Sequence, residues 1–161
     1  MTTAVGGRAP ATTRVPGWVP PSSLALALAG LAVSVYLTIE HYTAGTTLAC
    51  PESATVNCVK VTTSRYSQVL SVPVAVLGVV FFVVAAALCL PRVWRQGGAV
   101  RGVRLAVAAV GVVSVLYLVW AELFGVDAIC LWCTAVHLLT LALFAVIAIG
   151  TALVEDPLAD D

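Results

Sequence analysis

Charged residues are scarce in this 161-residue sequence, and their scarcity excludes several classes of protein. Only 10% of the residues are charged, whereas an average soluble domain has about 25%. Eight basic and eight acidic residues cancel, so the chain has no basic surface for nucleic acid, which we exclude as a main partner. The hydrophobic fraction of 61% and the mean hydropathy of +1.05 predict an integral membrane protein of one compact unit.

Four long stretches are almost free of charge, and each is long enough to cross a bilayer, which takes about 20 apolar residues in a helix. The predicted spans are residues 22–41, 72–90, 105–124 and 128–153. Prolines lie near the boundaries of these spans. Before the first span, a stop and an N-cap are expected from Pro20, Pro21, Ser22 and Ser23. Pro73 is expected in the first turn of the second span, and Pro91 at the end of the second span. We therefore predict an all-α integral membrane fold, a bundle of four transmembrane helices.

Three segments follow from these spans. Residues 1–21 are expected to form a disordered cytoplasmic tail rather than a signal peptide. Residues 22–154 are expected to form the membrane domain, and residues 155–161 an acidic cytoplasmic tail.

Basic residues are distributed unevenly among the predicted loops, and this sets the orientation. Six of the eight lie in the N-terminal tail or between the second and third spans: Arg8, Arg14, Arg92, Arg95, Arg101 and Arg104. Because basic residues concentrate in cytoplasmic loops, we expect both termini inside (N-in/C-in). Aromatic residues are expected at the two interfaces, Trp18 and Trp94 inside and Tyr42, Trp120 and Trp132 outside.

In this orientation four of the five cysteines face the oxidising, extracytoplasmic side. Cys50 and Cys58 lie in the first outer loop, and Cys130 and Cys133 lie at the outer start of the fourth span. Cys89 lies at the inner end of the second span, where we expect a small buried side chain without a chemical role.

The segment Cys130-Leu131-Trp132-Cys133 is a CxxC motif at a predicted helix start, with Asp127 expected as the N-cap. The free amides and the positive end of the helix dipole stabilise a thiolate there. Since the thiolate is the species that attacks and leaves in disulfide exchange, this position suits redox chemistry.

The loop pair Cys50 and Cys58 suggests a relay. The seven residues between these cysteines form a polar stretch that can close a small ring, so the loop pair can exchange with a soluble protein and then with the CxxC pair. Two static disulfides that staple the outer face remain an alternative. A zinc site is disfavoured, because an oxidising compartment favours disulfides over free thiolates.

Several polar residues lie near the CxxC motif, and for His137 the sequence leaves a functional and a structural role open. His137 lies four residues after Cys133 on the same helix face, where it can donate to a quinone carbonyl or bind a backbone carbonyl across the bundle. Glu40, His41 and Glu122 are expected to reach headgroup water at outer helix ends. Residues 59–70 predict either a short surface helix over the bundle mouth or a loop packed on the interface.

Together these motifs resemble the bacterial branch of the vitamin K epoxide reductase family. The resemblance spans residues 24–153 and rests on order and spacing: Cys50 and Cys58, then Ser64, then Val72-Pro73 opening a helix, then Cys130-Leu131-Trp132-Cys133 and His137. In one departure, Ser71-Val72-Pro73 stands where many bacterial relatives have Gly-Ile-Pro.

The resemblance implies a four-helix bundle around a quinone headgroup, with the active site at the outer membrane surface. Cys50 would take electrons from a reduced partner, Cys58 would pass them to Cys130, and Cys133 would face the quinone and form a transient adduct with it. Ser64 and His137 would contact the quinone. The implied partner is an extracytoplasmic thioredoxin-fold thiol oxidase that acts in trans.

We therefore expect a quinone-dependent thiol oxidoreductase of oxidative protein folding in the plasma membrane, with menaquinone or ubiquinone as electron acceptor and no metal. Two alternatives remain: a transporter or carrier that binds a soft metal ion through paired cysteines, and a structural membrane protein stapled by disulfides.

Overall fold

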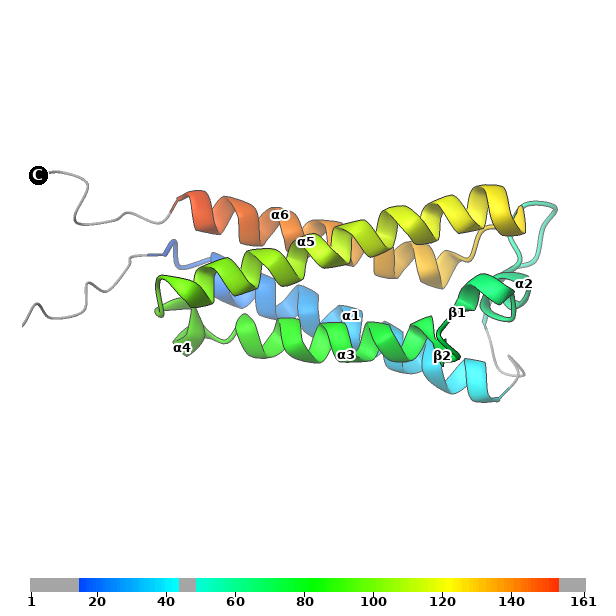
Figure 1. Ribbon diagram of the computed structural model, residues 1–161, viewed down its shortest axis with the longest axis horizontal. Helices are drawn as coiled ribbons and strands as arrows, with labels where there is room; N and C mark the ends of the chain where they lie inside the picture. The colour runs from blue at the N-terminus through cyan, green and yellow to red at the C-terminus, as the bar shows by residue number, and fades with distance from the viewer. Residues whose placement is uncertain (1–14, 44–48, 154–161) are drawn as a thin grey trace, which may run out of the picture.

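The computed structural model of the protein describes residues 15–43 and 49–153. Four helices run side by side along the molecule, and short elements cover both ends (Figure 1). The long helices are α1 (Val19–Tyr42), α3 (Val74–Leu88), α5 (Ala99–Trp120) and α6 (Leu131–Ala152). The prediction of an all-α architecture is confirmed. Most of the predicted N-terminal tail and the whole acidic tail lie outside the described residues.

Three stretches are long and apolar enough to cross a membrane: Val19–Tyr42, Ala99–Val126 and Leu131–Ala152. The third of the expected spans thus begins earlier than predicted and continues through a π-helical turn, η2 (Ala121–Val126). Helix α3 is apolar but has 15 residues, which extend about 22 Å. It is shorter than the predicted span of residues 72–90 because Leu90, before Pro91, adopts the extended conformation that a following proline favours.

The first helix begins at Val19, three residues before the predicted start. Pro20 and Pro21 lie inside its first turn instead of preceding the helix, because N–H groups of a first turn have no helical partner and their loss costs little. The hydroxyl of Ser23 donates to the carbonyl of Pro20 at 3.1 Å, so Ser23 is not the N-cap.

Residues 58–73 form a compact cap over one end of the bundle. Its elements are α2 (Cys58–Thr62), the 3₁₀ turn η1 (Arg65–Ser67), and the antiparallel pair β1 (Gln68–Val69) and β2 (Val72–Pro73). A single surface helix over residues 59–70 is therefore wrong. Hydroxyl groups of Thr62, Thr63 and Ser64 donate to carbonyls three or four residues earlier, at the point where α2 ends.

The hairpin between β1 and β2 turns at Leu70 and Ser71, which both have positive φ angles of 50° and 66°. Two consecutive residues in this conformation are typical of a tight hairpin turn and favour glycine. The positive φ explains why the family pattern has glycine at the position that Ser71 occupies here.

The opposite end of the bundle is closed by α4 (Pro91–Trp94), beside the start of α1 and the end of α6 (Figure 1). Arg104 belongs to α5 rather than to a loop and is buried, and its guanidinium group lies 3.8 Å from the Trp94 ring centroid. Trp94 is 2% exposed and donates to the hydroxyl of Ser23 at 3.1 Å. The expectation that Trp94 anchors the membrane interface is wrong, because this side chain packs in the core.

The core runs through the middle of the bundle and holds α1 closely against α3. Its buried members come from all four long helices and α4: Val19, Ala27, Phe82, Ala85, Cys89, Trp94, Ala108, Leu143 and Ile147. A Cβ atom at Gly30 would collide with the ring of Phe82, so only glycine allows this close approach. Cys89 is fully buried in this cluster, as expected for a packing residue.

Candidate redox site

All four outer cysteines lie at the end of the bundle that carries the cap. Cys50 and Cys58 form a disulfide, and Cys130 and Cys133 are free thiols at the start of α6. Cys58 and Cys130 are 1% and 0% exposed and belong to one buried cluster, against which Cys50 and Cys133 pack. The structure thus brings both predicted pairs into a single group of side chains.

A short backbone pairing holds the loop pair beside the CxxC motif. Val56 and Ile129 form a parallel bridge. The amide of Ile129 donates to the carbonyl of Thr55 at 2.9 Å, and the amide of Asn57 donates to the carbonyl of Ile129 at 3.1 Å. Because Cys130 directly follows Ile129 and Cys58 lies two residues after Val56, this pairing carries both cysteines into the same buried cluster.

Cys130 itself is the N-cap of α6, which corrects the expectation that Asp127 caps this helix. Its sulfur accepts a hydrogen bond from the Cys133 amide at 3.3 Å. Asp127 instead has a left-handed conformation, with φ at 53°. The chain reverses there, since the amide of Ala128 donates back to the carbonyl of Glu122, and aspartate tolerates this conformation better than most residues.

The surroundings of Cys130 favour its thiolate. The pKa of the Cys130 thiol is lowered, chiefly because the Cys133 side chain donates a hydrogen bond to its sulfur, and the amides of Cys133 and Trp132 act in the same direction. Burial and the charge of Glu122 oppose this effect without reversing it. The direction of this pKa shift favours the thiolate of Cys130, which is the species that attacks in disulfide exchange.

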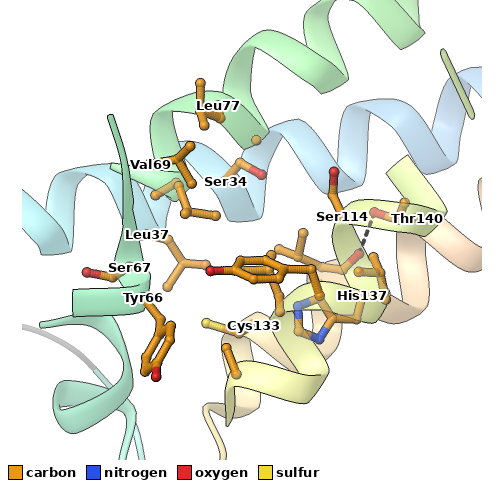
Figure 2. Close-up of a pocket in the computed structure, with 18 of the residues that line it drawn as sticks. Ser34, Leu37, Tyr66, Ser67, Val69, Leu77, Ser114, Cys133, His137 and Thr140 are labelled. Carbon is orange, nitrogen blue, oxygen red and sulfur yellow. Dashed lines mark hydrogen bonds between the residues drawn. The ribbon is translucent and has the colours of Figure 1, made fainter. Parts of the chain in front are cut away.

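A cavity of about 600 Å³ lies below the cysteines, between the cap and the four helices. Its wall is mostly apolar, and a volume of this size is typical of sites for small organic ligands. Cys133 and His137 of α6 lie around the same space as Tyr66 of the cap (Figure 2). Cys133 therefore belongs both to the cysteine group and to the cavity wall.

Ser64 and His137, the two residues expected to contact a quinone, both line this cavity. The Ser64 hydroxyl donates to the carbonyl of Val61 at 2.8 Å. His137 is 5% exposed, and its ring makes no hydrogen bond with any part of the chain that the structure describes. The backbone-bonded alternative for His137 is thus not what the described residues show, and the ring is available to a ligand.

Two carboxyl groups are placed differently from the expectation. Glu40 and Glu122 are 3% and 7% exposed, so neither reaches headgroup water, whereas His41 is half-buried at the cavity wall. The Glu122 carboxyl group lies within hydrogen-bonding reach of the Cys130 amide and the Cys133 thiol. The sequence does single out Glu122, because this charged residue interrupts an apolar stretch eight residues before Cys130. Whether its side chain faces the cysteines or the solvent depends on the π-helical turn, which the sequence does not reveal.

Two aromatic residues hold the backbone directly before Cys50. The Trp132 indole donates to the Ala49 carbonyl at 2.8 Å, and the Ala49 amide donates to the Tyr36 hydroxyl at 3.0 Å. The rings of Tyr36 and Trp132 also lie against each other, 4.9 Å between centroids. We call these two side chains the Ala49 clamp, because together they fix both polar atoms of one residue.

Within residues 15–43 and 49–153, no group of three or more histidine, cysteine, aspartate or glutamate side chains is arranged to hold a metal ion.

Comparison with known proteins identifies a family. Residues 22–148 match the sequence model of the vitamin K epoxide reductase family, which covers most of the chain and both cysteine pairs. No curated protein matches the sequence significantly.

Proposed function

Because this chain belongs to the vitamin K epoxide reductase family, a family of membrane oxidoreductases, we propose that it is a thiol:quinone oxidoreductase. It reoxidises an extracytoplasmic thioredoxin-fold thiol oxidase in trans and passes two electrons to a membrane quinone, either menaquinone or ubiquinone. The observation that carries this proposal is the double position of Cys133, which packs against the other cysteines and lines the apolar cavity.

The arrangement supports a relay of disulfide exchanges. Cys50 is the more accessible cysteine of the loop disulfide, so it is the sulfur that a reduced partner attacks. Cys58 is then released as a thiolate beside Cys130 and attacks the CxxC disulfide there. Each exchange transfers two electrons inward and ends with Cys133 reduced at the cavity wall.

The cavity fits a quinone headgroup. Its apolar wall suits the ring, and the side chains of Ser64, His137 and Thr140 supply polar atoms at its edge. A quinone bound there would accept the two electrons of the CxxC thiols. Ser64 and His137 would orient the ring by hydrogen bonds to its oxygens.

We further propose that the protein crosses the plasma membrane four times with both termini inside. Arg92 and Arg95 lie at the α4 end of the bundle, opposite the cysteines, and basic residues favour the cytoplasm. Helix α3 would complete its crossing with the extended residues of β2 before it and α4 after it. This places the redox site at the oxidising side, where disulfides persist.

The test separates the two half-reactions in purified protein with a soluble quinone analogue. We expect Cys133→Ala to abolish quinone reduction by any thiol donor. Cys50→Ala should abolish exchange with a thioredoxin-fold partner but leave reduction by a small dithiol, which reaches the CxxC motif directly. Cys89→Ala is the matched control, because Cys89 is buried at the far end and should not affect either reaction.

Equal loss of both reactions in the Cys50 and Cys133 variants would contradict the relay. Absence of quinone reduction in folded wild-type protein would contradict the proposed function itself and favour static disulfides.

A further inference from the structure

Glu122 has no role in the relay described above, yet its carboxyl group lies where the thiols meet the cavity. It lines the cavity together with Cys133 and contacts the Cys133 thiol. It also lies within reach of the Cys130 amide, so the carboxyl group is fixed by the chain reversal after η2. A buried carboxyl group in contact with a reacting thiol is positioned to exchange a proton with it.

The other titratable groups at the cavity wall come from α1, the cap, α5 and α6, while the α3 residues that line the cavity include none. These groups are His41, Tyr66, Tyr117, Cys133 and His137. Glu122 differs from these groups because its carboxyl group is a proton acceptor in direct contact with a redox sulfur, that of Cys133. With Glu122 only 7% exposed, solvent has little direct access to this proton path.

The proposed reaction requires such a path. Oxidation of the Cys130 and Cys133 thiols breaks two S–H bonds, forms one S–S bond and releases two electrons and two protons. Reduction of a quinone to a quinol consumes both electrons and both protons. Disulfide exchange moves the electrons but does not deliver protons to the quinone oxygens.

We propose that Glu122 is a catalytic proton carrier, an inference that rests on the proposed function. Its carboxylate takes the proton of the Cys133 thiol as that S–H bond breaks, and then gives it to a quinone oxygen. Cys130 reacts as the thiolate that its surroundings favour, so its own proton is already in the solvent, and the second proton of the quinol comes from water.

The variant Glu122→Gln separates this role from a purely structural one. The glutamine oxygen can still accept from the Cys130 amide, so the chain reversal is kept, but an amide group does not carry a proton. The variant Glu122→Asp keeps a carboxyl group on a shorter side chain. Glu40→Gln is the matched control, because Glu40 is also buried but does not line the cavity.

The experiment is a single turnover with the full-length protein, reduced in advance and mixed with a soluble quinone analogue, while quinone absorbance is followed. We expect Glu122→Gln to slow quinone reduction by about 10²-fold or more, the usual contribution of a general acid–base group. Glu122→Asp should recover part of the rate. Thiol exchange between the loop disulfide and the CxxC pair should not slow in Glu122→Gln, because the charge that is removed raises the pKa of Cys130. The thermal unfolding temperature should stay at the wild-type value in this variant, and Glu40→Gln should reduce quinone at the wild-type rate.

A wild-type rate in Glu122→Gln would overturn the inference and leave the proposed function intact. An equal loss of thiol exchange and quinone reduction in Glu122→Gln would also overturn it, by showing that Glu122 only holds the chain reversal. If wild-type protein itself reduces no quinone, the proposed function fails, and this inference fails with it.

Discussion

At the scale of single residues, the two cysteines of the CxxC motif differ in their surroundings. Cys130 is the N-cap of α6, and its sulfur accepts hydrogen bonds from both the amide and the side chain of Cys133. Cys133 lies within the first turn and faces the cavity. The same motif therefore provides one sulfur suited to exchange with Cys58 and another suited to react with a ligand.

We predict that Cys133→Ala raises the pKa of Cys130, because the substitution removes the side-chain hydrogen bond that stabilises the Cys130 thiolate. The thiolate fraction at neutral pH should fall accordingly. The measurement is thiolate ultraviolet absorbance against pH, in a background with the other cysteines replaced by serine. Cys133→Ser keeps a donor and should shift the pKa less; identical titrations of the Ala and Ser variants would contradict the assigned cause.

At the scale of elements, side chains of the long helices bind backbone atoms of the short segments at each end. At the end that carries the cap, the Ala49 clamp and the bridge to Ile129 hold the cysteine loop. At the α4 end, Arg104 donates to the carbonyls of Leu88 and Val93, which lie at the C-terminal ends of α3 and α4. The last carbonyls of a helix have no helical partner, so Arg104 supplies a donor to Leu88, while the Val93 carbonyl also accepts from the Gln96 amide.

We predict that loss of either half of the Ala49 clamp loosens the cysteine loop. Tyr36→Phe and Trp132→Phe each remove one hydrogen bond, worth about 1 kcal/mol, so backbone amides of residues 49–58 should exchange with solvent deuterium about fivefold faster. Tyr42→Phe is the control, because Tyr42 is 70% exposed. Unchanged exchange in both variants would show that the bridge to Ile129 alone holds the loop.

Arg104 gives a prediction about stability. Arg104→Leu removes both hydrogen bonds and leaves the Leu88 carbonyl without this donor, whereas the Val93 carbonyl keeps the Gln96 amide. We therefore expect a loss of about 1–3 kcal/mol in the free energy of unfolding and a lower Tm in detergent. Arg101→Leu, at an exposed position three residues earlier, should change the stability by less than about 0.5 kcal/mol. Equal effects of the two substitutions would show that the buried contacts of Arg104 contribute little.

At the scale of the whole molecule, the two ends of the bundle carry different kinds of residue. The cysteines, the cap and the cavity lie at one end, and α4 with its neighbouring arginines lies at the other (Figure 1). A membrane across the bundle would separate a redox end from a basic end. This polarity is what the proposed orientation depends on.

We predict that single cysteines introduced at Gln96 and at Glu52, in a variant without native cysteines, label from opposite sides of intact cells. The Glu52 position should react with an impermeant thiol reagent, and the Gln96 position should react only after the membrane is permeabilised. Labelling of both positions from outside would contradict the four-span arrangement, and the reverse pattern would contradict the orientation.

Much of the fold and part of the site could be predicted because their signals are local. Apolar runs mark the helices, and the spacing of the cysteines with Ser64 and His137 identified the family, which the match over residues 22–148 confirms. The roles of these residues in quinone binding and electron transfer stay predictions. The predicted helix ends were less accurate than the helices themselves. Pro20 and Pro21 are tolerated in the first turn of α1, and Pro91 begins the separate helix α4.

The sequence by itself determined an all-α membrane protein, its family and the placement of both cysteine pairs at one end, because each depends on composition or on residues close along the chain. Only the tertiary structure decided which groups meet. The burial of Glu122 against Cys133, the pairing of residues 55–57 with Ile129 and the burial of Arg104 over Trp94 each join residues of different structural elements. Such contacts depend on how helices pack and where the chain reverses, and no local pattern encodes that.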